Sequence, residues 1–349
     1  MRVIQSSVVS LGALVLLAAA GPATAAPVVQ TYAQAIGGQS AAVFSPPCTT
    51  FSAPAEVLSF FGSDGVANVV GGNAACGVAA DTHTHSAASG SLVDSAALST
   101  SFNAGANSFV GSASGNARPG KVGAEAHGTF SGSVNSLIVD GAQAFGLVRE
   151  TMTETSPTHA NGTPGSLVFA FTIDGKLATT NAATFVTTST VDVRYQTNSG
   201  PIFTLMRGQA NNSTSNPGLF APTAGDDVAG FTVGPGTAIG ADVFHTGAID
   251  FIWGTPFDFT LALLAYVAPG TDGTGDVDFA SSALLTGIDV RDAAGNPVTD
   301  FSIESGTGTL YDASGVHFAV PTTTPEPATL ALIGLGLAGL GFLRRRHAA

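Results

Sequence analysis

The stretch from Phe257 to Val267 constrains the fold more than any other part of the chain. Its apolar side chains recur at every second position, in a set made up of Phe257, Phe259, Leu261, Leu263, Ala265 and Val267. Successive side chains of a β-strand point to opposite faces, so this set lies on one face of a strand. We expect that face to line the core, and the other face, which carries Asp258 and Thr260, to be more exposed.

Shorter runs of the same kind follow one another between Gly, Pro, Asn and Asp residues. The predicted strands are 167–173, 185–193, 202–206, 249–253, 283–292 and 298–303, with a hairpin turn at 293–297. Earlier in the chain the alternation uses small residues, as in Val122, Ala124 and Ala126. Many short strands without intervening helices predict an all-β fold, an antiparallel β-sandwich or jelly-roll-like ectodomain. The alternative, a parallel β-solenoid, requires a fixed internal repeat, which we do not find.

The composition agrees with a folded, acidic, β-rich body. The chain has 44 Gly and 18 Pro, which favour turns, and 22 Phe, which supply apolar volume for a core. Only 10% of the residues are charged, and the formal net charge is −13. Nucleic acid is not an expected partner, because affinity for it depends on Lys and Arg that neutralise phosphates.

The first 25 residues have the pattern of a cleavable signal peptide. Arg2 provides the positive charge, residues 8–20 form an apolar run, and Ala23-Thr24-Ala25 provides small residues for cleavage after Ala25 or Ala26. The alternative is an uncleaved anchor. The apolar run is too short to span a membrane comfortably, and Gly21-Pro22 interrupts the chain directly after it. We therefore expect export.

Two cysteines, Cys48 and Cys76, lie in the body. In an exported chain they are expected to form one disulfide, because the compartment is oxidising. Two buried free thiols are the alternative. A metal pair is less expected, because the chain has no CxxC spacing.

Two groups of polar side chains are candidates for metal binding. Asp272, Asp276 and Asp278 place three carboxylates in and beside a Gly-rich loop, and carboxylate oxygens are the donors that Ca²⁺ prefers. An ordinary acidic turn is the expected interpretation, with calcium as the alternative. His83 and His85 would project from the same face of a strand, but zinc needs a further ligand that the sequence does not identify. We therefore expect no cofactor and no metal.

No catalytic residue is predicted. The chain contains no GxSxG nucleophile elbow, no HExxH motif and no lone Cys with a His partner. Paired carboxylates for glycoside hydrolysis remain an alternative, because such pairs form in space and leave no local motif. We expect a protein that is not an enzyme.

The C-terminal segment has three parts. Pro325-Glu326-Pro327 holds the backbone extended, residues 328–343 are apolar and can form a short membrane helix, and the basic end at 344–347 begins with Arg344, Arg345 and Arg346. A helix of 16 residues rises about 24 Å, less than the ~30 Å hydrocarbon core of a bilayer. A permanent anchor is normally longer.

This three-part segment resembles the PEP-CTERM sorting signal of Gram-negative bacteria. The resemblance implies recognition by a membrane-embedded exosortase, removal of the tail, and release to the cell surface or the exopolysaccharide matrix. The stretch 278–298 also resembles the last strands of many such proteins, which supports a β-rich fold and no particular activity.

The predicted organisation is a signal peptide at 1–25, a secreted β-rich body at 26–320 and a sorting tail at 321–349. The expected function is that of a surface or extracellular-matrix protein, exported through the inner membrane and held there transiently by its tail. It would be a structural or exopolysaccharide-associated component. The alternatives are a Ca²⁺-dependent glycan-binding module and a secreted hydrolase.

Overall fold

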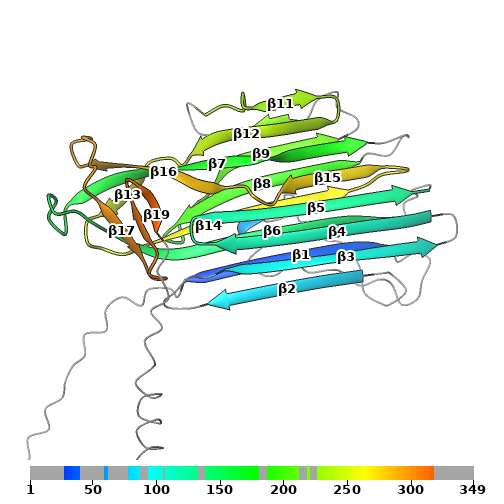
Figure 1. Cartoon of the computed structure of the whole chain (residues 1–349), viewed down its shortest axis with the longest axis horizontal. Coiled ribbons are helices and arrows are strands. Elements are labelled where there is room, and N and C mark those ends of the chain that lie inside the picture. Colours follow the sequence, from blue (N-terminus) through cyan, green and yellow to red (C-terminus); the bar gives the residue numbers. More distant parts are fainter. Residues whose placement is uncertain are drawn as a thin grey trace, which may run out of the picture.

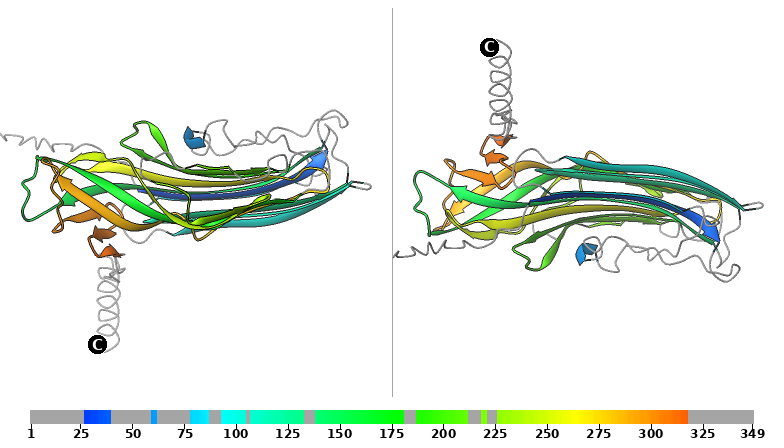
Figure 2. Two further views of the ribbon diagram at one scale, coloured as in Figure 1. Left: turned by 90° about the horizontal axis from the view of Figure 1, so that it is seen from above. Right: turned by 90° about the horizontal axis from the view of Figure 1, so that it is seen from below.

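The computed structural model describes residues 27–39, 59–61, 78–86, 93–104, 107–132, 138–180, 187–211, 218–220 and 226–317. Apart from one helical turn at 59–61, the regular structure in these ranges is antiparallel β-sheet. The strands form two sheets, which lie as two elongated layers on top of each other (Figures 1 and 2). The prediction of an all-β antiparallel body is confirmed.

The first sheet has ten strands. Its main order is β10 (Gly218–Phe220), β9 (Ile202–Asn211), β8 (Thr188–Thr197), β14 (Phe257–Ala268) and β6 (Ile138–Thr155). The second edge of β6 pairs with β1 (Val28–Gln39), which in turn pairs with β2 (Val78–Ser86). Further along, the same edge pairs with β17 (Ser302–Ser305), followed by β18 (Leu310–Asp312) and β19 (Gly315–His317).

The second sheet has nine strands. Its order is β11 (Phe231–Gly234), β12 (Thr237–His245), β7 (Pro164–Thr180), β15 (Thr274–Phe279), β5 (Lys121–Ser131), β4 (Asn107–Arg118) and β3 (Asp94–Ala104). β13 (Ile249–Ile252) pairs with the same edge of β7 as β12 does. β16 (Leu284–Asp292) pairs with the opposite edge of β7, the one that also pairs with β15.

The inner faces of the two sheets carry small residues along β1, β4, β5 and β6. The two sheets approach each other closely at Gly115 of β4 and Gly146 of β6. A Cβ on Gly115 would lie 2.4 Å from the carbonyl oxygen of Phe145, and one on Gly146 would lie 2.5 Å from that of Asn116. Backbone therefore packs directly on backbone here, which only glycine permits.

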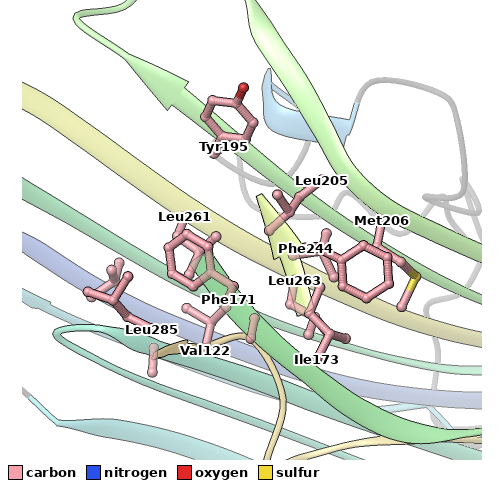
Figure 3. Close-up of a cluster of buried hydrophobic side chains, with 14 of the residues drawn as sticks. Val122, Phe171, Ile173, Tyr195, Leu205, Met206, Phe244, Leu261, Leu263 and Leu285 are labelled. Atoms are coloured by element: carbon pink, nitrogen blue, oxygen red, sulfur yellow. The ribbon is translucent and has the colours of Figure 1, made fainter. Parts of the chain in front are cut away.

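Large side chains fill the space between β7 and β14. The ring of Phe259 lies 4.7 Å from that of Phe169, between centroids, and the Phe171 ring is parallel to it at 6.2 Å. Leu261 and Leu263 lie close to Phe171 and Ile173 in the same cluster (Figure 3). The predicted core face of residues 257–267 is confirmed, because the whole alternating set is buried.

The opposite face of β14 differs from the prediction. Asp258 is half-buried, but Thr260, Ala262 and Leu264 are fully buried. Phe60 and Phe61 belong to the cluster that contains Ala262 and Leu264, so a segment far away in the sequence covers this face. The expectation of an exposed Thr260 was wrong because period two identifies the faces of a strand but not what covers each of them.

The other predicted strands correspond to β7, β8, β9, β13 and β16, with one exception near the end of the body. Residues 293–297 form the expected turn, with Gly295 at φ 82°. The predicted strand at 298–303 begins only at Ser302, after one backbone hydrogen bond from Val298 to Val290. The reason is topological, because the chain crosses here from β16 in the second sheet to β17 in the first.

Candidate functional site

An open groove of about 1000 Å³ lies between the end of β8 and the start of β9 in the first sheet and the connection from β12 to β13 in the second. Its lining combines aromatic and aliphatic side chains with hydroxyl groups, a histidine and an acid. The lining residues are Val168, Tyr195, Thr197, Pro201, Ile202, Phe203, Thr204, His245, Thr246, Gly247, Ala248, Ile249 and Asp250. Its volume is about twice that of a neighbouring hollow of about 460 Å³.

A β-bulge places Phe203 in this groove. Val193 pairs with Met206, whereas the next residue, Arg194, pairs with Thr204, so Leu205 is the extra residue. The bulge brings Phe203 opposite Tyr195, on the inner face of the sheet. In regular pairing Phe203 would lie opposite Gln196 and face the other way. Bulges re-aim side chains in this manner and are frequent beside functional sites.

Phe203 remains accessible because neither sheet covers it. Its ring stacks on that of Tyr195, with centroids 5.3 Å apart and planes 23° from parallel, yet 45% of Phe203 is exposed. β10 pairs with β9 only at residues 207–209, beyond the bulge. The aromatic pair therefore forms a platform, with Tyr195 buried behind and the Phe203 ring facing the solvent.

The second sheet is interrupted on the opposite side of the groove. Residues 246–248 separate β12 from β13, and the Thr246 hydroxyl accepts a 3.0 Å hydrogen bond from the Phe169 amide in this gap. The Gly247 amide donates to the Tyr195 hydroxyl at 2.8 Å. This bond fixes the Tyr195 ring, whose hydroxyl points away from the core side chains (Figure 3). Burial raises the pKa of Tyr195, so the phenol stays neutral at physiological pH.

Two acids and a histidine supply the charge of the groove. The Asp226 carboxylate is almost completely buried and accepts hydrogen bonds from the His245 amide at 2.6 Å and its Nδ1 at 2.7 Å. Asp250 is exposed and forms no ion pair within the described part of the chain. The groove can thus offer a flat apolar surface, hydroxyl groups and one accessible carboxylate to a ligand.

The three acids predicted as a calcium alternative have separate partners. Asp272 accepts a hydrogen bond from the Gly132 amide at 2.8 Å. Asp276 pairs with Lys176 at 2.6 Å and with His127 at 3.7 Å. Asp278 accepts a 3.4 Å bond from the Ala280 amide. Within the described ranges, no three His, Cys, Asp or Glu residues are grouped as metal ligands would be. Calcium binding at these acids stays a hypothesis.

Several predicted site residues lie outside the described ranges. These are Cys48 and Cys76, the sorting residues Pro325, Glu326 and Pro327, and the basic residues Arg344, Arg345 and Arg346, together with the signal peptide. His83 and His85 lie in β2, opposite Thr31 and Val29 of β1. The disulfide and the domain boundaries stay predictions.

Comparison with protein families identifies a sorting motif at the C-terminal end of the chain. The model of the PEP-CTERM protein-sorting motif matches residues 323–346. The chain carries a PEP-CTERM protein-sorting motif at its C-terminal end. The match contains the Pro-Glu-Pro segment and the three arginines, so the resemblance drawn from those residues is confirmed. No curated protein and no solved structure matches the chain.

This motif implies that the chain is exported and sorted by an exosortase, a membrane enzyme, to the surface or the extracellular space. In the part of the chain that the structure describes, no helix is long and apolar enough to cross a membrane.

Neither Tyr195 nor Phe203 was predicted as a site residue from the sequence. Their strands were expected, but the bulge that brings them together was not. One signal does exist, because Leu205 and Met206 are adjacent large apolar residues that break the period of two. Both are fully buried, as a bulge allows.

Proposed function

We propose that this protein is a non-catalytic component of the cell surface or extracellular matrix whose β-sandwich body holds extracellular polysaccharide in the Tyr195–Phe203 groove. The sorting motif at 323–346 supports the destination. The exposed Phe203 ring, stacked on the buried Tyr195 ring, is the observation that carries the binding function.

The chemistry of the groove suits a sugar chain. A pyranose ring has a flat face of C–H groups and an edge of hydroxyl groups. The C–H face packs on an aromatic ring by dispersion and by burial of apolar surface. Thr197, Thr204 and Asp250 supply polar groups around the platform for the hydroxyl edge. The groove is open to solvent, so a sugar chain can reach the exposed Phe203 ring.

The test is complementation of a gene deletion in the native host. Strains would carry the wild-type gene, Phe203→Ala or Ile239→Ala. Ile239 is the matched control, because it is a large apolar residue that is 52% exposed on β12 but does not line the groove. We expect wild type and Ile239→Ala to remain with the matrix polysaccharide and to restore its architecture, and Phe203→Ala to be lost to the medium. Equal retention of all three would overturn the proposal.

A further inference from the structure

The charge of the groove distinguishes among polysaccharides. Among the described residues that line it, the ionisable groups that reach the solvent are Asp250 and His245, and no Lys or Arg is present. His245 is already paired with Asp226, so the pair carries no net positive charge even when the imidazole is protonated. The accessible charge in the groove is therefore negative.

A second hollow extends this acidic surface. It has a volume of about 460 Å³, lies beside the groove and shares Asp250 with it. Its other acid is Asp292, whose Oδ1 accepts hydrogen bonds from the amides of Ala294 at 2.9 Å and Asn296 at 2.8 Å. These bonds stabilise the ionised carboxylate. The described lining of this hollow also contains no Lys or Arg.

We propose that the groove selects polysaccharide segments that carry protonated amino groups, such as a deacetylated amino-sugar chain, over acetylated or carboxylated segments. The inference rests on the proposed function and adds the class of sugar. A protonated amine placed on the Phe203 platform meets the aromatic face, which attracts cations. The same amine can pair with Asp250 at the boundary of the two hollows. A uronate would instead place its carboxylate near Asp250 and be repelled.

Three oligosaccharides of equal length test the selection. They share a β-1,4 backbone and differ in the charged or acetylated groups that each sugar carries. They are a chitosan hexamer with free amines, a chitin hexamer with acetylated amines, and a hexamer of β-1,4-linked glucuronic acid. Affinities of the purified protein would be measured by titration calorimetry at low salt and at a pH where the amines are protonated. We expect the chitosan hexamer to bind at least about fivefold more tightly than the chitin hexamer, and the glucuronic acid hexamer most weakly.

Matched variants separate the groove from the overall acidity of the protein. Asp250→Asn and Glu125→Gln each remove one exposed carboxylate, but Glu125 lies on β5, away from the groove. We expect Asp250→Asn to lower affinity for the chitosan hexamer about threefold and to leave affinity for the chitin hexamer unchanged, whereas Glu125→Gln changes neither affinity.

Equal losses of affinity in both variants would overturn the inference, as would binding of the glucuronic acid hexamer equal to that of the chitosan hexamer. Those results would leave sugar binding intact. Failure of every oligosaccharide to bind, or Phe203→Ala binding them as wild type does, would count against the proposed function itself.

Discussion

The hydroxyl of Tyr311 on β18 donates a 2.5 Å hydrogen bond to Glu150 on β6, in the interior between the two sheets. Both side chains are fully buried, and Thr307 also donates to the same carboxyl group at 3.4 Å. Burial raises the pKa of Glu150, and the bond from Tyr311 opposes that rise. This bond ties the short C-terminal strands to β6 at one end of the body.

Replacing Tyr311 by Phe should destabilise the protein by about 1 to 3 kcal/mol, because it leaves a buried carboxyl oxygen without its donor. Urea unfolding would measure the loss. A double-mutant cycle with Glu150→Leu, which removes the acceptor, gives the control. If the two substitutions are additive, the side chains are not coupled and the account of this bond is wrong.

Glu154 lies four residues further along β6 and has no such donor. It is fully buried, and neither carboxyl oxygen has a hydrogen-bond partner within the described part of the chain. Burial raises its pKa from 4.5 to about 9. The folded protein therefore keeps Glu154 protonated at neutral pH, whereas the unfolded chain ionises it. The free energy of unfolding therefore falls progressively as the pH rises from 4.5 to about 9, and the fall levels off above about 9.

Glu154→Gln should remove this pH dependence, because Gln resembles the protonated acid and does not titrate. We expect equal stability of variant and wild type near pH 4.5, and a growing advantage of the variant toward pH 9, on the order of a few kcal/mol. The free energies of unfolding of both proteins, measured from pH 4.5 to 9, would show this growing difference. A constant difference between the two proteins across that range would contradict the buried, neutral carboxyl group.

Gly146→Ala should destabilise the body by at least about 2 kcal/mol, because the new methyl group would meet the carbonyl oxygens of Asn116 and Gly123 in the facing sheet. Gly234→Ala is the control. Its nearest neighbour would be Thr237 Cγ2 at 3.6 Å, so we expect a change of no more than about 0.5 kcal/mol. Thermal unfolding of both variants would measure the two losses of stability. Equal losses would show that the two sheets do not approach closely at Gly146.

Replacement of Pro325-Glu326-Pro327 by three alanines should block processing, because we expect an exosortase to recognise that segment of the matched motif. The substituted protein should stay in the membrane fraction with a larger intact mass that still includes Arg344 to Arg346. A simple anchor would behave differently, since substitution upstream of the helix would then change neither mass nor location.

The sequence predicted the strands well where a local pattern sufficed. The alternation from Phe257 to Val267 identified the core face of β14, and the alternation of the small residues Val122, Ala124 and Ala126 correctly indicated a strand, which is β5. These predictions depend only on the alternation of faces along one strand.

Features that depend on which distant segments meet were not predictable. Thr260 is buried because its face of the sheet is covered, and the close approach of Gly146 to the Asn116 carbonyl group depends on how the two sheets align. The groove depends on a one-residue shift in the pairing of β8 with β9. An amino-acid pattern records the period of a strand, but pairing register and sheet packing join residues far apart in the chain.

Direct titration of the purified protein with extracellular polysaccharide from the native host tests the central claim, that the exposed Phe203 platform binds the polymer. Wild type and Ile239→Ala should bind with equal affinity, and Phe203→Ala should bind at least about tenfold more weakly, because it removes the apolar centre of the groove. Circular dichroism would establish that the variants are folded. Unchanged affinity in folded Phe203→Ala would contradict the account.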